Sequence, residues 1–313
     1  MTRPDVLVDA RWAAEGGTRD VLGIRRFAQE VIARLPRAES LEGGLPLLHP
    51  LEPLWLTAVI ALRRPAVYFS PGFNPPAWSA APLVFCIQDL IHLAIPAEST
   101  PLIRAYYRTV VRPAGRRARA VCTASHFARD EVRAWLGETV HVVAVGAGVA
   151  SEFRPDGDRA TRGRPYVLYV GNRKPHKNLP RLFEAFARSG IAGEASLLLT
   201  GSSDPETVEA AWRAGVERSV DFAGRVAEAD LPALYRGALA TALPSLYEGF
   251  GLPALESMAC GVPVVGSNVT AVLEVVGDAG ILVDPLDVEA IADGLRRAVE
   301  DEGLRRRCRK RGL

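Results

Sequence analysis

Residues 243–268 read LPSLYEGFGLPALESMACGVPVVGSN, and this stretch decides the fold of the second half of the chain. The apolar run Ala240–Leu243 before it is typical of a buried strand, and Pro244 marks the turn that ends it. Pro253 stands in the first turn of a helix that we expect over residues 252–260, with Gly261 as its stop signal. Residues 262–266 are apolar again and predict a second buried strand. The stretch therefore predicts a strand, a helix and a parallel strand of an α/β domain.

The turn before this helix has the composition of an anion site. Glycines at 249 and 251 let a phosphate approach the backbone, where bare N–H groups and the positive end of the helix dipole point the same way. Glu248 and Glu256 flank the turn, and because a carboxylate repels phosphate, each is expected to accept hydrogen bonds from the hydroxyls of a ribose or a sugar. Backbone N–H groups that can donate to phosphate thus lie between two carboxylates that can accept from the hydroxyls of a sugar. This combination indicates a nucleotide-sugar site. The alternative is that Glu248 caps the helix and Glu256 lies on its solvated face.

A second concentration of charge follows the apolar run at residues 166–170. The loop after it contains Arg173, Lys174, His176 and Lys177. The chain has only three lysines, and two of them fall in this loop. A diphosphate that loses its sugar needs cationic donors where charge develops, and Arg and Lys at the end of a strand supply them. A basic turn on the surface is the alternative.

In the first half of the chain, polar residues follow an apolar run at residues 83–87. Ligands of open α/β sheets bind beyond the carboxyl ends of the strands, so Gln88, Asp89 and His92 are placed for chemistry. His92 could instead be a capping or packing histidine. Gly16, Gly17 and Gly23 lie between the first strand and helix, but the G-x-G-x-x-G spacing is absent, which argues against a nicotinamide enzyme.

Composition limits the remaining choices. A formal net charge of +2 over 313 residues argues against nucleic acid as the main partner. The apolar run at residues 54–62 is too short to span a bilayer, which needs about 20 residues. The chain opens without a signal-peptide pattern, and its four cysteines have no metal or redox spacing, so we expect a cytoplasmic protein with reduced thiols. We expect one domain over residues 1–153, a linker over 154–164 and a second domain over 165–313.

Residues 248–265, EGFGLPALESMACGVPVV, resemble the signature of the retaining glycosyltransferases of family 4. The resemblance is strong over residues 165–300 and weaker over 1–150. It implies an α/β GT-B fold, with two doubly wound Rossmann-like domains facing a cleft. It also implies that Glu248 and the backbone of Gly249, Phe250, Gly251 and Leu252 hold the transferred sugar and the diphosphate, while Glu256 holds the ribose.

The same resemblance implies roles for residues elsewhere in the chain. Lys177 matches a lysine of the family, and Arg173 lies one position later than the usual arginine; both would stabilise the leaving diphosphate. Gly201, Arg225 and Val226 would belong to the donor site. Gln88 replaces a histidine that contacts the sugar in relatives, and glutamine can hydrogen-bond but cannot carry charge. Asp89, His92 and the glycines 16, 17 and 23 would lie on the sugar or acceptor side.

The activity implied is transfer of a hexosyl unit from a nucleotide diphosphate sugar, with GDP-mannose favoured. The acceptor would be a hydroxyl of a glycan, a lipid-linked glycan or a small metabolite, and neither a metal nor a cofactor is expected. Two alternatives stay open: a nucleotide-sugar-binding partner subunit with little activity, which Gln88 motivates, and a nucleotide-sugar epimerase.

A basic stripe in the first half suggests a further partner. Arg104, Arg108 and Arg112 follow one another at helical spacing, and such a stripe can bind anionic lipid at a membrane surface. A solvated helix face is the alternative.

Overall fold

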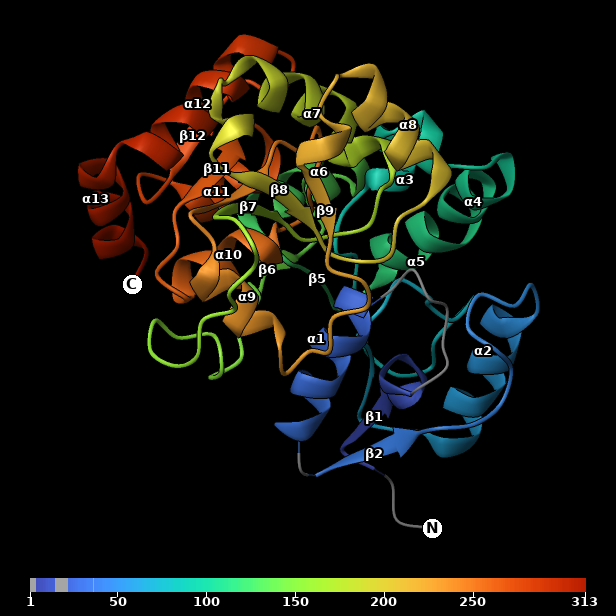
Figure 1. Ribbon diagram of the computed structural model, residues 1–313. Coiled ribbons are helices and arrows are strands. Elements are labelled where there is room, and N and C mark those ends of the chain that lie inside the picture. Colours follow the sequence, from blue (N-terminus) through green and yellow to red (C-terminus); the bar gives the residue numbers. More distant parts are fainter. Residues whose placement is uncertain (1–3, 15–21, 36) are drawn as a thin grey trace. The chain divides into compact units, whose positions relative to one another are not determined.

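The computed structural model describes residues 4–14, 22–35 and 37–313, and the chain divides into two units at Ala147 and Gly148 (Figure 1). Gly16 and Gly17 lie outside the described residues. The segment 154–164, expected to be a linker, falls within the second unit, where Phe153 just before it packs with Tyr166 and Tyr235. Each unit is described by itself below.

The first unit contains one parallel sheet in the order β2-β1-β3-β4-β5-β6. Its strands are β1 (Val6–Asp9), β2 (Ala38–Leu41), β3 (Val67–Ser70), β4 (Leu83–Cys86), β5 (Ala120–Thr123) and β6 (Val142–Ala144). Its α-helices are α1 (Leu22–Ala33), α2 (Glu52–Arg63), α3 (Ile91–Ala94), α4 (Pro101–Tyr106), α5 (Arg112–Arg117) and α6 (His126–Leu136). Large buried side chains such as Tyr68, Phe85 and Tyr107 fill the core of this unit.

A helical segment continues through Pro113, where a proline in a helical pattern usually predicts a break. Residues Tyr107–Val111 form a π-helical turn between α4 and α5, in which the Arg112 N–H donates to the Tyr107 carbonyl five residues back. Proline has no N–H and its ring crowds the preceding turn, so the wider π-turn accommodates Pro113 without ending the helix.

The second unit also contains one parallel sheet, in the order β12-β11-β10-β7-β8-β9. Its strands are β7 (Tyr166–Tyr169), β8 (Ser196–Leu199), β9 (Val220–Phe222), β10 (Ala240–Leu243), β11 (Val264–Ser267) and β12 (Ile281–Val283). Its α-helices are α7 (Leu179–Arg188), α8 (Pro205–Arg213), α9 (Leu231–Gly237), α10 (Leu252–Ala259), α11 (Thr270–Val276), α12 (Val288–Glu300) and α13 (Glu302–Gly312).

Helices cover both faces of the second sheet, and the side chains of β7 show why. Val167 and Tyr169 pack into one cluster with α7 and α12, whereas Tyr166 and Leu168 pack into another with α9. Alternate side chains of a strand point to opposite faces, so a strand buried on both sides is a continuous apolar run. The unit is therefore doubly wound, and the strand order reverses between β7 and β10. This reversal is where such sheets bind ligands.

Candidate active site

Two predicted residues meet where the strand order of the second unit reverses. Lys177 follows β7 and Glu248 follows β10, and Lys177 Nζ lies 2.7 Å from Glu248 Oε1. The two side chains are only 10% and 11% exposed. An ammonium carries three N–H donors, so the bond to Glu248 does not saturate Lys177. The contact places a cation and an anion together at the expected diphosphate and sugar positions.

Glu248 is held from two further directions. The Ser245 hydroxyl donates to Glu248 Oε1 over 2.7 Å, and the Glu248 N–H donates to Thr270 Oγ1 over 3.2 Å. Thr270 has a φ of 57°, an uncommon conformation for a β-branched residue, and backbone strain of this kind is concentrated at functional sites. Glu248 does not cap α10, whose N-cap is Gly251, so the capping alternative is not what the structure shows.

The loops after β7 and β10 are tied to each other by hydrogen bonds. Asn178 Nδ2 donates to the Pro244 carbonyl over 3.0 Å and to the Pro285 carbonyl over 2.7 Å. The Leu246 N–H donates to the carbonyl of His176, which is itself buried, over 2.7 Å. These hydrogen bonds hold the loops of Lys177 and Glu248 together, and a preorganised site lowers the cost of binding.

The predicted anion turn leads into α10 as expected. Gly251 precedes the helix with a φ of 93°, in the region that favours glycine, and Pro253 stands in the first turn. Residues 249–251 thus lead from Glu248 into α10, which begins at Leu252.

Glu256 does not lie on a solvated face. It is 3% exposed, and the Tyr235 hydroxyl from α9 donates to its Oε2 over 2.9 Å. A buried carboxylate needs hydrogen bonds, and Tyr235 supplies one. Tyr235, Ser245 and Thr270 were not singled out in the sequence. The packing of α9 and of the start of α11 brings Tyr235 and Thr270 to the two glutamates, whereas Ser245 lies three residues before Glu248 in the same loop.

Arg173 occupies a pocket beside Lys177 and does not contact Glu248. Its guanidinium bonds Asp204 over 2.8 Å and the Thr200 carbonyl over 3.3 Å, and it lies 5.3 Å from the ring centre of Phe222. Arg173 Nε is buried and has no hydrogen-bond partner among the described residues. The pocket measures about 970 Å³, and Gly171, Gly201 and Leu246 line it as well. A buried N–H without a partner indicates a position for water or ligand.

Asp204 has a structural role in addition to its contact with Arg173. It caps α8 by accepting hydrogen bonds from the Thr207 N–H and hydroxyl. Burial alone would raise the pKa of Asp204, but the hydrogen bonds from Thr207 and the charge of Arg173 outweigh it and lower that pKa.

The remaining donor-side predictions lie at the ends of β8 and β9. The Gly201 N–H donates to the Gly224 carbonyl over 2.9 Å, which joins the two loops. Arg225 is exposed, whereas Val226 is partly buried against the cluster that contains Tyr235. Val226 thus lies on the Glu256 side of the site.

The three polar residues that follow β4 have different surroundings. Asp89 accepts a hydrogen bond from the Ile91 N–H over 3.0 Å at the start of α3. His92 Nδ1 lies 2.7 Å from the Glu98 carbonyl, and its ring packs near Phe73 and Tyr107, as the packing alternative predicted. Gln88 Nε2 is buried with no hydrogen-bond partner in the described part of the chain. Gly23 lies inside α1.

A buried charge network at the ends of β1 and β3 was not predicted. Arg11 pairs with Asp9 over 2.6 Å and with Glu52 over 2.7 Å, and Asn74 donates to both carboxylates. Burial is the main cause that raises the pKa of Glu52. Asp9 directly follows the buried run of β1, and a charged residue at that position is the signal that could have found the network. The network fixes the loops at the point where the strand order of the first unit reverses.

The expected basic stripe is interrupted. Arg104 and Arg108 are exposed, but Arg112 lies 5.9 Å from the ring centre of Trp135 and donates from Nε to the Trp135 carbonyl over 3.1 Å. Within the described residues, no helix is long and apolar enough to cross a bilayer.

Comparison with known sequences identifies the family of the chain. The family model described as glycosyl transferases group 1 matches residues 152–313. O-antigen chain mannosyltransferase B of Escherichia coli is 33% identical over 305 residues, which cover 90% of this chain and 77% of that protein. Other curated relatives are longer, and the chain spans between 16% and 53% of their length.

Solved structures share the fold of the chain. Sucrose-phosphate synthase of Thermosynechococcus elongatus has a TM-score of 0.75 at 20% identity, over 99% of this chain and 93% of that one. Anabaena HepE, solved with UDP and glucose, has a TM-score of 0.74 at 17% identity, over 99% of this chain and 95% of that one. These likenesses, together with the two parallel sheets, confirm the predicted α/β GT-B fold.

Proposed function

Because the chain belongs to the glycosyl transferases of group 1, and so is a glycosyltransferase, we propose that it transfers a hexosyl unit from a nucleotide diphosphate sugar to an acceptor hydroxyl with retention of the anomeric configuration. The observation that carries this proposal is the contact between Lys177 and Glu248 at the β7–β10 reversal. It supports the assignment of one loop to the diphosphate and the other to the sugar.

Negative charge develops on the diphosphate as its bond to the sugar breaks. Lys177 would move part of its hydrogen bonding from Glu248 to the phosphate oxygens, and the N–H groups at the start of α10 would donate to the same oxygens. Arg173 is the second cation, with Nε as its unused donor. These donors stabilise the leaving group more strongly than the bound substrate, which is what accelerates the reaction.

The two glutamates hold the sugars on either side of the diphosphate. Glu248, already oriented by Ser245, accepts hydrogen bonds from hydroxyls of the transferred sugar. Glu256, oriented by Tyr235, accepts from the ribose. The departing phosphate takes the proton of the acceptor hydroxyl, so the scheme uses neither a protein nucleophile nor a metal ion. This is the scheme of the retaining family 4 enzymes.

GDP-mannose is the proposed donor. The 33% identical relative is named a mannosyltransferase, which supports a mannosyl donor. The HepE structure contains UDP, so UDP-sugars are included among the donors to be assayed. The proposed acceptor is a hydroxyl of a glycan, a lipid-linked glycan or a metabolite on the cytoplasmic side of the membrane.

A transfer assay tests this proposal. The protein is incubated in EDTA with a panel of glycan acceptors and one radiolabelled donor at a time. The donors are GDP-mannose, UDP-glucose, and ADP and TDP sugars. We expect a labelled product with GDP-mannose in the presence of EDTA, and an anomeric configuration by NMR that matches the donor. An inverted product contradicts retention, and loss of activity in EDTA contradicts the metal-free scheme. Nucleotide binding without transfer would favour the partner-subunit alternative, and a changed sugar without acceptor the epimerase.

A further inference from the structure

An apolar face of α2 in the first unit is exposed. Leu51, Leu54 and Leu62 point outward together with two alanines at 58 and 61, and Leu54 and Leu62 are 62% and 83% exposed. These positions fall within one side of the helix, while Leu56 and Ile60 on the other side are buried. A helix that is apolar on both its buried and its outer side is unusual at a protein surface.

Trp78 extends this face. The Trp78 N–H donates to Thr57 Oγ1 of α2 over 3.1 Å, and Trp78 is itself 57% exposed. The neighbouring Ala77 N–H donates to the Pro53 carbonyl over 3.0 Å. The segment that bears Trp78 therefore lies along α2 and continues its apolar face.

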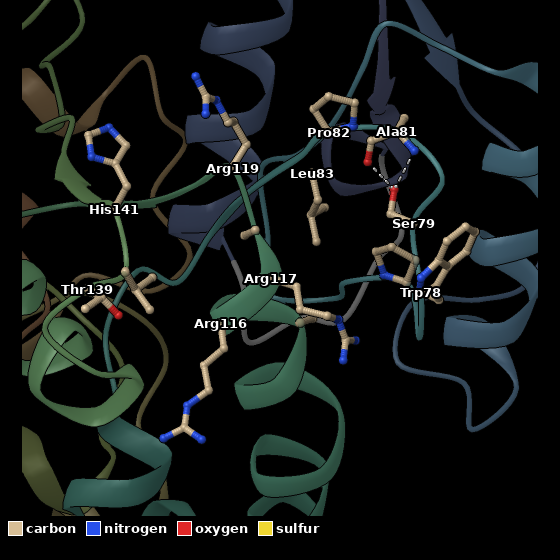
Figure 2. Close-up of a pocket in the computed structure, with 14 residues that line it drawn as sticks. Trp78, Ser79, Ala81, Pro82, Leu83, Arg116, Arg117, Arg119, Thr139 and His141 are labelled. Carbon is tan, nitrogen blue, oxygen red and sulfur yellow. Dashed lines mark hydrogen bonds between the residues drawn. The ribbon is translucent and has the colours of Figure 1, made fainter.

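A basic pocket adjoins Trp78. It measures about 530 Å³ and lies at the amino ends of β4, β5 and β6, with Trp78, Arg116, Arg117, Arg119 and His141 in its lining (Figure 2). Arg117 links the pocket to the Trp78 segment, because its guanidinium donates to the Ala77 carbonyl over 2.9 Å. None of the fourteen residues that line the pocket is acidic.

The arrangement of the arginines indicates the kind of partner. Figure 2 shows the side chains of Arg116, Arg117 and Arg119 projecting in different directions, so they do not converge on a single phosphate. Spread cations beside exposed leucine and tryptophan suit a surface that presents many separate negative charges above an apolar layer. An anionic lipid bilayer has this structure, and tryptophan and arginine favour its headgroup region.

We propose that the α2–Trp78 surface, which consists of Leu51, Leu54, Leu62, Trp78, Arg116 and Arg117, docks the protein on an anionic lipid bilayer. The leucines and the indole enter the boundary between headgroups and acyl chains, and the arginines bind lipid phosphates. This surface differs from the stripe of Arg104, Arg108 and Arg112 that the sequence suggested. Its arginines line the pocket at the amino ends of β4, β5 and β6, which is the edge of the sheet opposite to Gln88.

Vesicle sedimentation tests the proposal with the full chain. We expect the wild type to sediment with vesicles of phosphatidylglycerol and phosphatidylcholine, much less with phosphatidylcholine alone, and less as salt screens the charges. Both Leu54→Ser/Leu62→Ser and Arg116→Gln/Arg117→Gln should lower partitioning by at least about tenfold, given the usual contributions of buried methylenes and of arginines at an anionic surface. Thermal unfolding of each variant shows whether it is folded.

Trp212 provides a matched control. It is 67% exposed on α8 of the second unit, where the neighbouring Glu209 and Arg213 pair with each other. We expect Trp78→Ser to lower vesicle binding and Trp212→Ser to leave it unchanged. Equal effects of the two substitutions, equal binding to both vesicle types, or a wild type that stays in the supernatant would each overturn the proposal. A dimer in solution that Leu54→Ser/Leu62→Ser dissociates would instead assign the surface to a second copy of the chain.

Discussion

Lys177 and Glu248 are the residues on which the chemistry depends most. We expect Lys177→Ala and Glu248→Ala each to lower kcat by about 100-fold or more, the scale of losing one electrostatic contact in a site that excludes water. Steady-state kinetics of sugar transfer measures the effect. Lys310→Ala, on the exposed side of α13, is the matched control and should leave kcat unchanged. Wild-type turnover in both site variants would remove these residues from the mechanism.

Tyr235 acts through Glu256 and is expected to affect binding more than turnover. Tyr235→Phe removes the hydrogen bond to Glu256 Oε2, and a bond of this kind contributes about 1 kcal/mol. We expect the KM for the donor to rise about fivefold, with kcat nearly constant. Tyr166→Phe is the control, because that hydroxyl donates to the Leu234 carbonyl in the same cluster. Tyr166→Phe should lower the melting temperature but leave the KM for the donor unchanged. A raised KM in Tyr166→Phe together with an unchanged KM in Tyr235→Phe would contradict the role of Tyr235.

Sequence reasoning applies most directly to residues that the end of a strand places by itself. Lys177, Glu248 and Gln88 lie in loops that follow apolar strands, and the carboxyl ends of parallel strands share one edge of a sheet. It could not find Tyr235 or Thr270, because their positions depend on how distant segments pack, and it missed Ser245 although this residue lies only three positions before Glu248. His92 shows the converse: its place after a strand suggested chemistry, but its ring and Nδ1 are engaged by Phe73, Tyr107 and the Glu98 carbonyl.

At the scale of single elements, the start of α8 should make stability depend on pH. The lowered pKa of Asp204 means that its ionised form is favoured in the folded state. The resulting stabilisation is fully present above the ordinary aspartate pKa of about 3.9 and is lost as the pH falls through the lowered value. Urea unfolding should therefore show Asp204→Ala less stable than wild type by about 1 kcal/mol near pH 7, the usual contribution of a helix cap. The difference should shrink below about pH 4. A constant difference across that range would show that ionisation of Asp204 does not stabilise the fold.

The junction between α9 and residues 154–164 leaves no room at Gly237. A Cβ on Gly237 would lie 2.2 Å from the Ala160 carbonyl oxygen and 2.4 Å from Tyr166 Oη. We expect Gly237→Ala to lower the free energy of unfolding by roughly 1–3 kcal/mol, the usual cost of overpacking. Gly193→Ala has no atom within 4 Å of the new Cβ and should change stability by less than about 0.5 kcal/mol. Equal stability of the two variants, measured by urea unfolding, would show that the 154–164 segment moves away freely.

Element boundaries were less predictable than element types. The strand Ala240–Leu243 begins and ends where the sequence indicated, whereas the strand expected at 262–266 is Val264–Ser267. Pro263 has no N–H to donate to the ladder, and Val264 is the first residue of β11 paired with β10, opposite Thr241. The π-turn before Pro113 could not be inferred, since a proline in a helical pattern usually predicts a break.

For the whole molecule, the alternation of strands and helices was sufficient to predict two doubly wound α/β domains. The division between Ala147 and Gly148 was harder to predict from the sequence, because the polar residues 154–164 have the composition of a linker but belong to the second unit. One of their hydrogen bonds, from the Ala160 N–H to the Ala233 carbonyl, is formed with an element more than seventy residues later.

The central claim is that the diphosphate binds at the carboxyl ends of β7 and β10, where the strand order of the second sheet reverses. Hydrogen exchange of the whole chain, with and without the nucleoside diphosphate that gives the largest thermal shift among GDP, UDP, ADP and TDP, tests it most directly. We predict that the ligand slows exchange at amides 171–178 and 248–256, and that Lys177→Ala abolishes this protection at the same ligand concentration. Protection confined to the first unit, or undiminished in Lys177→Ala, would contradict the account.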